Sequence, residues 1–228
     1  MDFRLVPAGD AAWLIELPER IDVAVNTRAI RIARDVERSG LRATDVVVGY
    51  RSVMVYVDPL ADDAATVERR LHEIAAATVG GEDASGPIVE VPVCYDAPHG
   101  PDLADVAAFG KCSIDEVIER HLALEYRVFV VGFVPGFAYM ASVDPKIAAP
   151  RRSSPRLKVP AGSVAVAAGQ TGVYPAETPG GWSLIGRCPV KPYDPDRSAP
   201  FLFHPGDRIR FHRISEPEYR AATQWGDA

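Results

Sequence analysis

The stretch SVAVAAGQTGVYPAETPGGWSLIGR, residues 163–187, places short apolar runs between turns rich in glycine and proline. The same pattern extends through the second half of the chain, with apolar runs at residues 126–133, 163–168, 172–174, 183–188 and 207–212. Several short strands separated by such turns are typical of a closed or nearly closed β-barrel. We therefore predict a barrel domain for this half.

The residues that lead into the barrel predict one strand and two helices. Residues 88–94 read as a strand. Residues 101–109 read as a helix with Asp102 and Asp105 near its start, where acids interact favourably with the helix dipole. Ser113, with Glu116 three residues on, predicts an N-cap that opens a second helix ending near residue 123.

The first 80 residues follow a different pattern, in which strands alternate with amphipathic helices. Strands are expected at residues 3–6, 12–17, 46–48 and 53–57, and helices at residues 22–39 and 63–77. The order β-β-α-β-β-α predicts a small α+β domain with helices on one face of a sheet. Residues 80–87 read as a linker, so we place two domains at residues 1–82 and 83–228.

Composition and charge exclude several classes of protein. The chain has 228 residues, 47% of them apolar, and a net charge of −6. That charge argues against a general affinity for nucleic acid or anionic membranes. Residues 1–4 do not begin a signal peptide, and residues 159–176 contain three glycines and two prolines, which suit no transmembrane helix. We therefore expect a cytoplasmic protein.

The cysteines and histidines follow no disulfide or metal-binding pattern. Cys94, Cys112 and Cys188 are odd in number and lack CxxC spacing, so we expect reduced thiols. The five histidines are scattered, and none forms a pair at metal-ligand spacing. A metal site would need ligands that only the fold brings together. From the sequence we predict no metal site.

The sequence contains no standard nucleotide-binding or hydrolase motif. GxxxxGK[ST], HExxH and GxGxxG are not found. Residues 181–186 miss the GxSxG pattern because the closing glycine comes one residue late. The sequence therefore predicts neither an ATP motif nor a self-contained nucleophile in this chain.

An aromatic segment at residues 132–139, GFVPGFAY, is the first candidate for a binding site. Glycine permits close approach of the backbone and Pro135 restricts the loop, so Phe133, Phe137 and Tyr139 could wall a pocket. The alternative is that these aromatic side chains only pack a corner of the barrel.

A basic segment at residues 150–164 concentrates positive charge in an acidic protein. Arg151 and Arg156 are candidate anion ligands, because guanidinium groups bind carboxylate or phosphate through a planar fork. The alternative is a solvated loop, or a face for an acidic partner.

A third segment, residues 169–187, combines neutral polar groups with one more arginine. Gln170, Thr171 and Tyr174 supply the donors and acceptors that a small amide ligand needs. Arg187 follows an apolar strand, so it needs an anionic ligand or a carboxylate partner. Residues 179–182 otherwise read as a tight turn with one aromatic plug.

These segments together resemble one protein family closely. The resemblance rests on residues 132–139, 155–164, 169–175 and 179–187, and extends to Tyr95, residues 100–103 and residues 125–127. It covers nearly the whole chain. The chain is similar to the family that contains the 5-oxoprolinase B subunit, allophanate hydrolase subunit 1 and KipI-like proteins.

The resemblance implies both a fold and an activity. The fold is an α+β N-terminal domain followed by a cyclophilin-like β-barrel domain. The activity is the ATP-dependent opening of 5-oxoproline to glutamate, with ATP used together with magnesium by a complex. The partners are a carboxyltransferase-like C subunit and an A subunit, and we expect this chain to be inactive alone.

Three ionisable residues are candidates for acid or base chemistry under that interpretation: Glu125, His121 and Asp144. The arginines would bind carboxylate or phosphate, and the polar groups of residues 170–174 would orient the amide. Relatives usually carry a glutamate shortly after the residue that Tyr95 resembles, whereas this chain has Pro98 there. If that glutamate serves chemistry in the relatives, this chain lacks it, although Asp96 lies close in the sequence.

Two other functions remain open on the same motifs. A KipI-like protein would inhibit a sensor histidine kinase through the same barrel face. An allophanate hydrolase subunit 1-like protein would serve carboxyl transfer to urea or another amide, which requires a biotin carrier that this chain lacks. A neighbouring kinase gene, or neighbouring carboxylase genes, would favour these alternatives.

Overall fold

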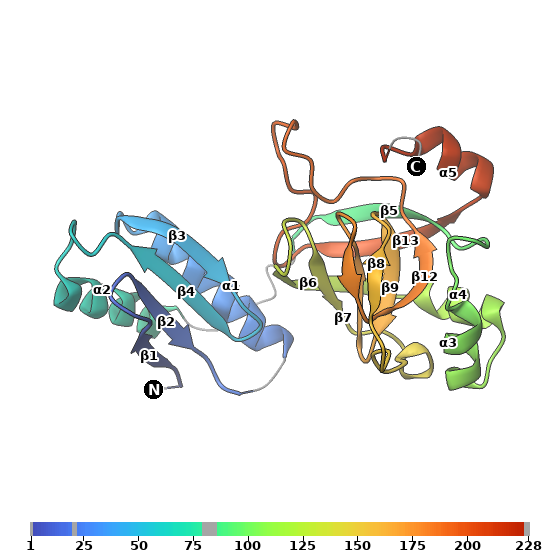
Figure 1. Ribbon diagram of the computed structural model, residues 1–228. Coiled ribbons are helices and arrows are strands. Elements are labelled where there is room, and N and C mark those ends of the chain that lie inside the picture. The colour runs from blue at the N-terminus through green and yellow to red at the C-terminus, as the bar shows by residue number, and fades with distance from the viewer. Residues whose placement is uncertain (1, 20–21, 79–85, 226–228) are drawn as a thin grey trace. The chain divides into compact units, whose positions relative to one another are not determined.

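The computed structural model describes residues 2–19, 22–78 and 86–225, and the chain divides into two compact units, Met1–Ser85 and Gly86–Ala228 (Figure 1). Each unit has its own hydrophobic core. The predicted boundary after residue 82, and most of the predicted linker, lie outside the described residues. Among the residues described, no helix combines the length and apolarity that a membrane span requires.

The first unit is a four-stranded antiparallel sheet with two helices, in the order β-β-α-β-β-α. The strands follow the order β1-β2-β4-β3 across the sheet. The elements are β1 (Arg4–Pro7), β2 (Ala12–Glu16), α1 (Val23–Arg38), β3 (Ala43–Val48), β4 (Ser52–Val57) and α2 (Ala64–Ala77).

Alternation along β4 explains how this sheet is covered. Val53, Val55 and Val57 are buried, and between them Met54 and Tyr56 are less so, so one face of the strand carries the core. Both helices contribute to the same core, including Ile32 of α1 and Leu71 of α2. In Figure 1, α1 and α2 lie on one face of the sheet.

The second unit is built on a closed barrel of seven strands, which confirms the predicted barrel. Around the barrel the strands follow the order β10-β7-β6-β13-β5-β12-β9, and only the β13–β5 pair among them is parallel. Their bounds are β5 (Ile88–Cys94), β6 (Glu125–Val131), β7 (Ala138–Ala141), β9 (Ser163–Ala167), β10 (Gln170–Val173), β12 (Ser183–Arg187) and β13 (Arg208–Ile214).

Helices lie between and after the strands of this barrel. They are α3 (Leu103–Gly110), α4 (Ile114–Leu122), the 3₁₀ helix η1 (Pro145–Ile147) and α5 (Glu216–Ala222). Apolar residues of α3, α4 and η1 share one core with the barrel interior. The Ser113 hydroxyl accepts a hydrogen bond from the Glu116 N–H, as the N-cap prediction requires.

A short antiparallel ribbon completes this unit, made of β8 (Arg156–Val159) and β11 (Thr178–Gly180). The alternating residues of strand β9 show why a second hydrophobic core forms beside this ribbon. Val164 and Val166 belong to the main core, whereas Ala165 and Ala167 belong to a separate cluster with Val159 of β8. The two faces of the barrel wall are therefore both buried, and the second cluster is the one that adjoins the candidate site.

Candidate functional site

Aromatic side chains line a cavity of about 270 Å³ in the barrel unit. They come from the β6–β7 connection, from β7, from the end of β10 and from the residue before β12. Its aromatic lining consists of Phe133, Phe137, Tyr139, Tyr174 and Trp182. The four of these predicted as site residues, all except Trp182, are therefore brought together, although they lie up to 41 positions apart. We call this cavity the aromatic pocket.

Phe137 lies at the centre of this aromatic wall. Its ring makes edge-on contacts with the rings of Tyr139, Tyr174 and Trp182, at centroid distances of 4.8, 5.1 and 5.5 Å. Such pairs stabilise by about 0.5–1.5 kcal/mol each beyond the burial of area. Only 2% of Phe137 is exposed, so the wall has a fixed shape before any ligand arrives.

Close backbone approach makes room for that ring. A Cβ atom on Gly172 of β10 would lie 2.8 Å from the carbonyl oxygen of Ala138 and 3.2 Å from Phe137 Cζ. Any larger residue at this position would have to displace the ring or strand β7. Phe133, at the rim, is 63% exposed and is available to a ligand or a partner.

Two arginines stand at the edge of the aromatic pocket. Arg151 Cζ lies 6.0 Å from the centroid of the Trp182 ring, within the range of a cation–π contact, and Arg151 is exposed. Arg152 also lines the cavity. A guanidinium beside an aromatic wall suits a small ligand with one anionic group and one apolar face.

The tyrosine hydroxyls in the aromatic pocket remain protonated at neutral pH. Burial raises the pKa of Tyr174 to about 12, and burial also raises the pKa of Tyr139, while the charge of Arg151 opposes both shifts. A phenol that keeps its proton can donate a hydrogen bond to a carbonyl or carboxylate oxygen.

A buried carboxylate holds the basic segment against the barrel. Asp102 accepts hydrogen bonds from Arg156 Nη2 at 2.6 Å, from Arg152 Nη1 at 3.1 Å and from the Leu184 N–H at 2.7 Å. The Asp102 side chain is 3% exposed. Arg156, predicted as an anion ligand, thus has a carboxylate partner within the protein and is not among the residues that line the aromatic pocket.

The remaining predicted ligands lie elsewhere in the barrel wall. Arg187 donates from Nε to the carbonyl oxygen of Ala161 at 3.0 Å. Thr171 is fully buried, and its hydroxyl donates to the Ala165 carbonyl oxygen at 3.1 Å. Gln170 pairs with Ala141 and Ala167 across the sheet. These three residues do not line the aromatic pocket.

His121, a candidate acid or base, is buried between two hydroxyl groups. Its Nδ1 lies 2.7 Å from Tyr95 Oη and its Nε2 lies 2.9 Å from Thr171 Oγ1. Burial lowers the pKa of the imidazole to about 3, so it is neutral at physiological pH. This geometry ties α4 to β10 and to Tyr95, the residue after β5, rather than presenting a proton to a ligand.

Glu125 and Asp144, the two carboxylate candidates, each pair with arginine. Glu125 lies 3.2 Å from Arg210 Nη2 on the adjacent strand. Asp144 lies 2.7 Å from Arg120 Nη1 and accepts the Lys146 N–H at the start of η1, which together lower the pKa of its carboxyl. Neither residue lines the aromatic pocket, so their catalytic role stays a prediction.

Sequence reasoning missed Asp102 as a site residue because its arginine partners lie 50 and 54 positions away. The available signal was the Gly-Pro-Asp-Leu run at residues 100–103, which carries part of the family resemblance. Trp182 was expected to act as a plug, and Arg152 was not singled out.

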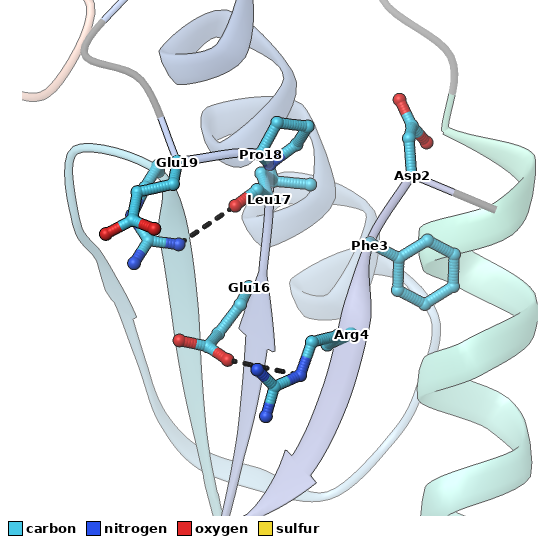
Figure 2. A pocket seen from close by; sticks show the side chains of 8 residues that line it. Asp2, Phe3, Arg4, Glu16, Leu17, Pro18 and Glu19 are labelled. Carbon is cyan, nitrogen blue, oxygen red and sulfur yellow. Dashed lines mark hydrogen bonds and ion pairs between the residues drawn. The ribbon is translucent and has the colours of Figure 1, made fainter.

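The first unit has a cavity of its own, of about 340 Å³ (Figure 2). Its charged groups are largely occupied within the protein. Arg4 Nε lies 3.7 Å from Glu16 Oε2, and Arg51 Nη1 donates to the carbonyl oxygen of Leu17 at 3.0 Å. None of the predicted site residues lies in this cavity.

Comparisons with known proteins place the chain in a family. A family model described as the carboxyltransferase domain, subdomain C and D, matches residues 3–203. The Bacillus subtilis protein named as the B subunit of 5-oxoprolinase is 38% identical over an alignment that covers 96% of this chain and 96% of that protein. The chain belongs to the 5-oxoprolinase B subunit family. An Escherichia coli protein of the same name is 39% identical over 89% of this chain and 92% of its own length.

Solved structures show that the chain also shares its fold with known proteins. The crystal structure of TTHA0988 matches with a TM-score of 0.80 and 36% identity, over 90% of this chain and 40% of that one, so the chain spans less than half of it. PH0987 from Pyrococcus horikoshii is 40% identical over 95% of this chain and 100% of that one, with a TM-score of 0.57. Kluyveromyces lactis urea carboxylase, 18% identical with a TM-score of 0.77 over 96% of this chain and 22% of that one, shares the fold alone.

Proposed function

We propose that this chain is the B subunit of an ATP-dependent 5-oxoprolinase and that the aromatic pocket binds 5-oxoproline. The supporting observation is one cavity that combines a rigid aromatic wall, Arg151 at the rim and the protonated hydroxyl of Tyr174. Relatives named as the B subunit of 5-oxoprolinase support the same reaction.

The ligand 5-oxoproline has a flat five-membered lactam ring with a carboxylate at one side. The carboxylate suits Arg151, and the ring suits the aromatic faces beside it. A cavity of about 270 Å³ is near the lower limit of about 300–1,000 Å³ for ligand pockets, which favours a small metabolite over a nucleotide.

The reaction consumes one ATP and two waters for each lactam opened. Transfer of the γ-phosphoryl group to the amide oxygen releases ADP and makes the ring carbon electrophilic. One water attacks that carbon, cleavage of the C–N bond leaves an acyl phosphate, and a second water hydrolyses it to glutamate and phosphate. Positive charge and hydrogen-bond donors near the amide oxygen stabilise the negative charge that develops there. In this chain Arg152 and the hydroxyls of Tyr139 and Tyr174 would supply such groups.

Partner subunits supply what the aromatic pocket lacks. We infer that a carboxyltransferase-like C subunit completes the pocket, and that ATP and magnesium are bound with the help of an A subunit, so the chain alone is inactive. Glu125, His121 and Asp144 are engaged within the protein, which supports placing the acid and base on a partner. We place the complex in the cytoplasm, where ATP is available.

Leaving out the subunits one by one tests this proposal. The chain is co-expressed with its neighbouring A and C subunits, and glutamate release from 5-oxoproline and ATP is measured. We expect activity from the full complex and none without this chain. A complex that does not open 5-oxoproline but carboxylates urea when a biotin carboxylase and its carrier are supplied would instead support the carboxyltransferase alternative. Binding to a sensor kinase, without lactam opening, would support the inhibitor alternative.

A further inference from the structure

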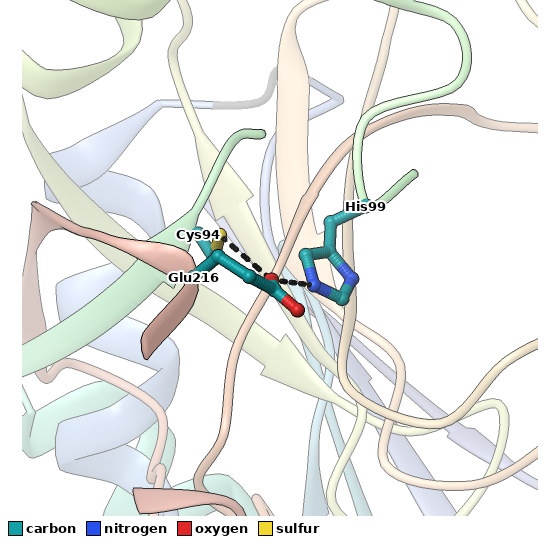
Figure 3. Close-up of side chains that lie close together, drawn as sticks. All are labelled: Cys94, His99 and Glu216. Carbon is teal, nitrogen blue, oxygen red and sulfur yellow. Dashed lines mark hydrogen bonds and ion pairs between the residues drawn. The ribbon is translucent and has the colours of Figure 1, made fainter. Parts of the chain in front are cut away.

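Three potential metal ligands converge at the edge of the barrel, away from the residues of the aromatic pocket (Figure 3). Cys94 ends β5, His99 lies in the connection to α3, and Glu216 is the first residue of α5. Their ligand atoms all lie within 4.8 Å of one another. Cys94 Sγ is 3.7 Å, and His99 Nε2 is 2.5 Å, from the same oxygen, Oε2 of Glu216.

Regular backbone structure fixes two of these residues next to each other. Strands β5 and β13 run parallel, with Cys94 opposite Ile214 at the end of the ladder. Helix α5 begins directly afterwards, and hydrogen bonds from the Ser215 N–H and hydroxyl to Glu218 hold its first turn. The register of the sheet therefore sets the distance between the thiol and the carboxylate.

The surrounding side chains orient Glu216 and His99. Arg220 Nε lies 2.7 Å from Oε1 of Glu216, so this contact leaves Oε2 turned toward Cys94 and His99. The imidazole of His99 lies against the ring of Tyr219, with centroids 4.5 Å apart. A hydrogen-bonded partner that orients a ligating carboxylate, as Arg220 does for Glu216, is typical of metal sites.

A small rearrangement would bring the three ligand atoms to the distances of a tetrahedral zinc site. Bonds of about 2.0–2.3 Å from zinc to N, O and S put neighbouring ligand atoms about 3.4 Å apart. The Cys94–Glu216 separation is already near this value. The His99–Glu216 separation must widen by about 1 Å for the ion to enter, and His99 sits in a loop rather than a strand.

We propose that Cys94, His99 and Glu216 form a binding site for a divalent zinc-class metal ion, with water as the fourth ligand. Thiolate, imidazole and carboxylate together favour zinc over magnesium or calcium, which prefer oxygen ligands. One thiolate and one carboxylate balance the charge of the ion. Binding breaks the S–H bond of Cys94 and releases that proton to solvent.

The partial exposure of His99 and Glu216 to solvent supports water as the fourth ligand. Cys94 is buried, but the side chains of His99 and Glu216 are 9% and 26% exposed. Sites with three protein ligands characteristically keep one position for water or another small molecule. The bound ion would join α5 to the loop that follows β5, independently of whether the chain acts on 5-oxoproline.

The test uses the full chain, stripped of metal with a chelator and then titrated with zinc against a chromophoric competitor. Cobalt replaces zinc in a second titration, because a thiolate ligand gives a charge-transfer absorption in the near ultraviolet. The ligand variants are Cys94→Ser and His99→Ala. The matched controls are Cys112→Ser and His204→Ala, which change the same residue types outside the cluster.

We expect one zinc per chain, the cobalt–thiolate band, and a higher thermal midpoint with zinc. Each ligand variant should weaken zinc binding by at least about 100-fold, which exceeds the loss usually caused by mutating a residue that only hydrogen-bonds a metal ligand. The control variants should bind zinc as tightly as the parent protein does. The proposal is overturned if zinc binds no more tightly to the parent than to either ligand variant, or if Cys112→Ser abolishes the cobalt band. If Cys94→Ser does not fold, the zinc affinity of His99→Ala alone decides whether the proposal holds.

Discussion

Arg156 Nη2 lies 2.6 Å from Oδ1 of the buried Asp102, and this ion pair fastens the start of β8 to the barrel wall. Arg152 binds the same carboxylate oxygen from four residues earlier in the chain. Arg151 directly precedes the first of these two anchors and lies over Trp182. Asp102 thus positions the arginine that we expect to meet the substrate, although it does not itself line the aromatic pocket.

Replacing this carboxylate should destabilise the barrel unit. In Asp102→Ala, the Leu184 N–H and two guanidinium groups lose their shared acceptor, at a cost of about 2–4 kcal/mol in the free energy of unfolding. Asp102→Asn should cost less, because its amide oxygen can still accept the Leu184 N–H. Urea unfolding measures both variants.

The control for this experiment is the neighbouring acid. Asp105 is 75% exposed and lies 3.7 Å from Arg152, so Asp105→Ala should change the free energy of unfolding by less than about 0.5 kcal/mol. Equal losses in the Asp102 and Asp105 variants would contradict the account of Asp102 as an anchor.

Gly172→Ala tests the fixed shape of the aromatic pocket. The new methyl group would crowd the Ala138 carbonyl oxygen and the Phe137 ring, so we expect a loss of about 1–3 kcal/mol in stability. It should also weaken binding of 5-oxoproline to the assembled complex, because the aromatic wall moves.

The matched control is Gly169→Ala, three residues away in the same hairpin. A Cβ at Gly169 meets no atom within 4 Å, so stability should change by less than about 0.5 kcal/mol. Melting curves and ligand titrations on both variants compare the two positions directly. A neutral Gly172→Ala would show that the Phe137 ring can shift freely.

His121 should make the protein less stable in mild acid. Its pKa is about 3 in the folded protein and about 6.5 when exposed, so the unfolded chain binds the extra proton between these values. Stability is therefore lost as the pH falls below about 6.5. From pH 7 to pH 5 this residue alone should contribute a loss of about 2 kcal/mol.

A His121→Gln variant isolates that contribution. Its stability should be lower at both pH values, but its loss between pH 7 and pH 5 should be smaller than that of the parent by about 2 kcal/mol. Urea unfolding at the two pH values gives the comparison. An identical pH dependence in the two proteins would mean that His121 is not neutral in the folded state.

The sequence predicted six of the seven barrel strands because their apolar runs are bounded by glycine and proline, as in β9 and β10. It missed β7 (Ala138–Ala141), which overlaps the segment interpreted as an aromatic pocket wall. It did not predict β8 and β11, since the exposed Leu157 and Lys158 and the run Thr178-Pro179-Gly180 carry no alternating apolar signal. Helix α5, only seven residues long, was missed for a similar reason.

Some site residues could likewise be predicted from the sequence, whereas their partners in the tertiary fold could not. Phe137 was predicted to wall a pocket and Tyr174 to supply a polar group to an amide, and the barrel brings their rings within 5.1 Å of each other. The partner of Arg156 could not be predicted, because Asp102 approaches it only through the tertiary fold. The meeting of Cys94 with Glu216 depends on a parallel strand register across 122 positions.

The most direct test of the central claim is the steady-state kinetics of Arg151→Ala in the assembled complex, with Lys158→Ala as control. Lys158 is a cation on β8 whose side chain is 78% exposed and pairs with Glu177. If Arg151 binds the carboxylate of 5-oxoproline, its loss should lower kcat/KM for glutamate release by about 10–100-fold, corresponding to about 1.5–3 kcal/mol, while Lys158→Ala stays near the parent. Unchanged kcat/KM in a fully assembled Arg151→Ala complex would contradict the aromatic pocket as the substrate site.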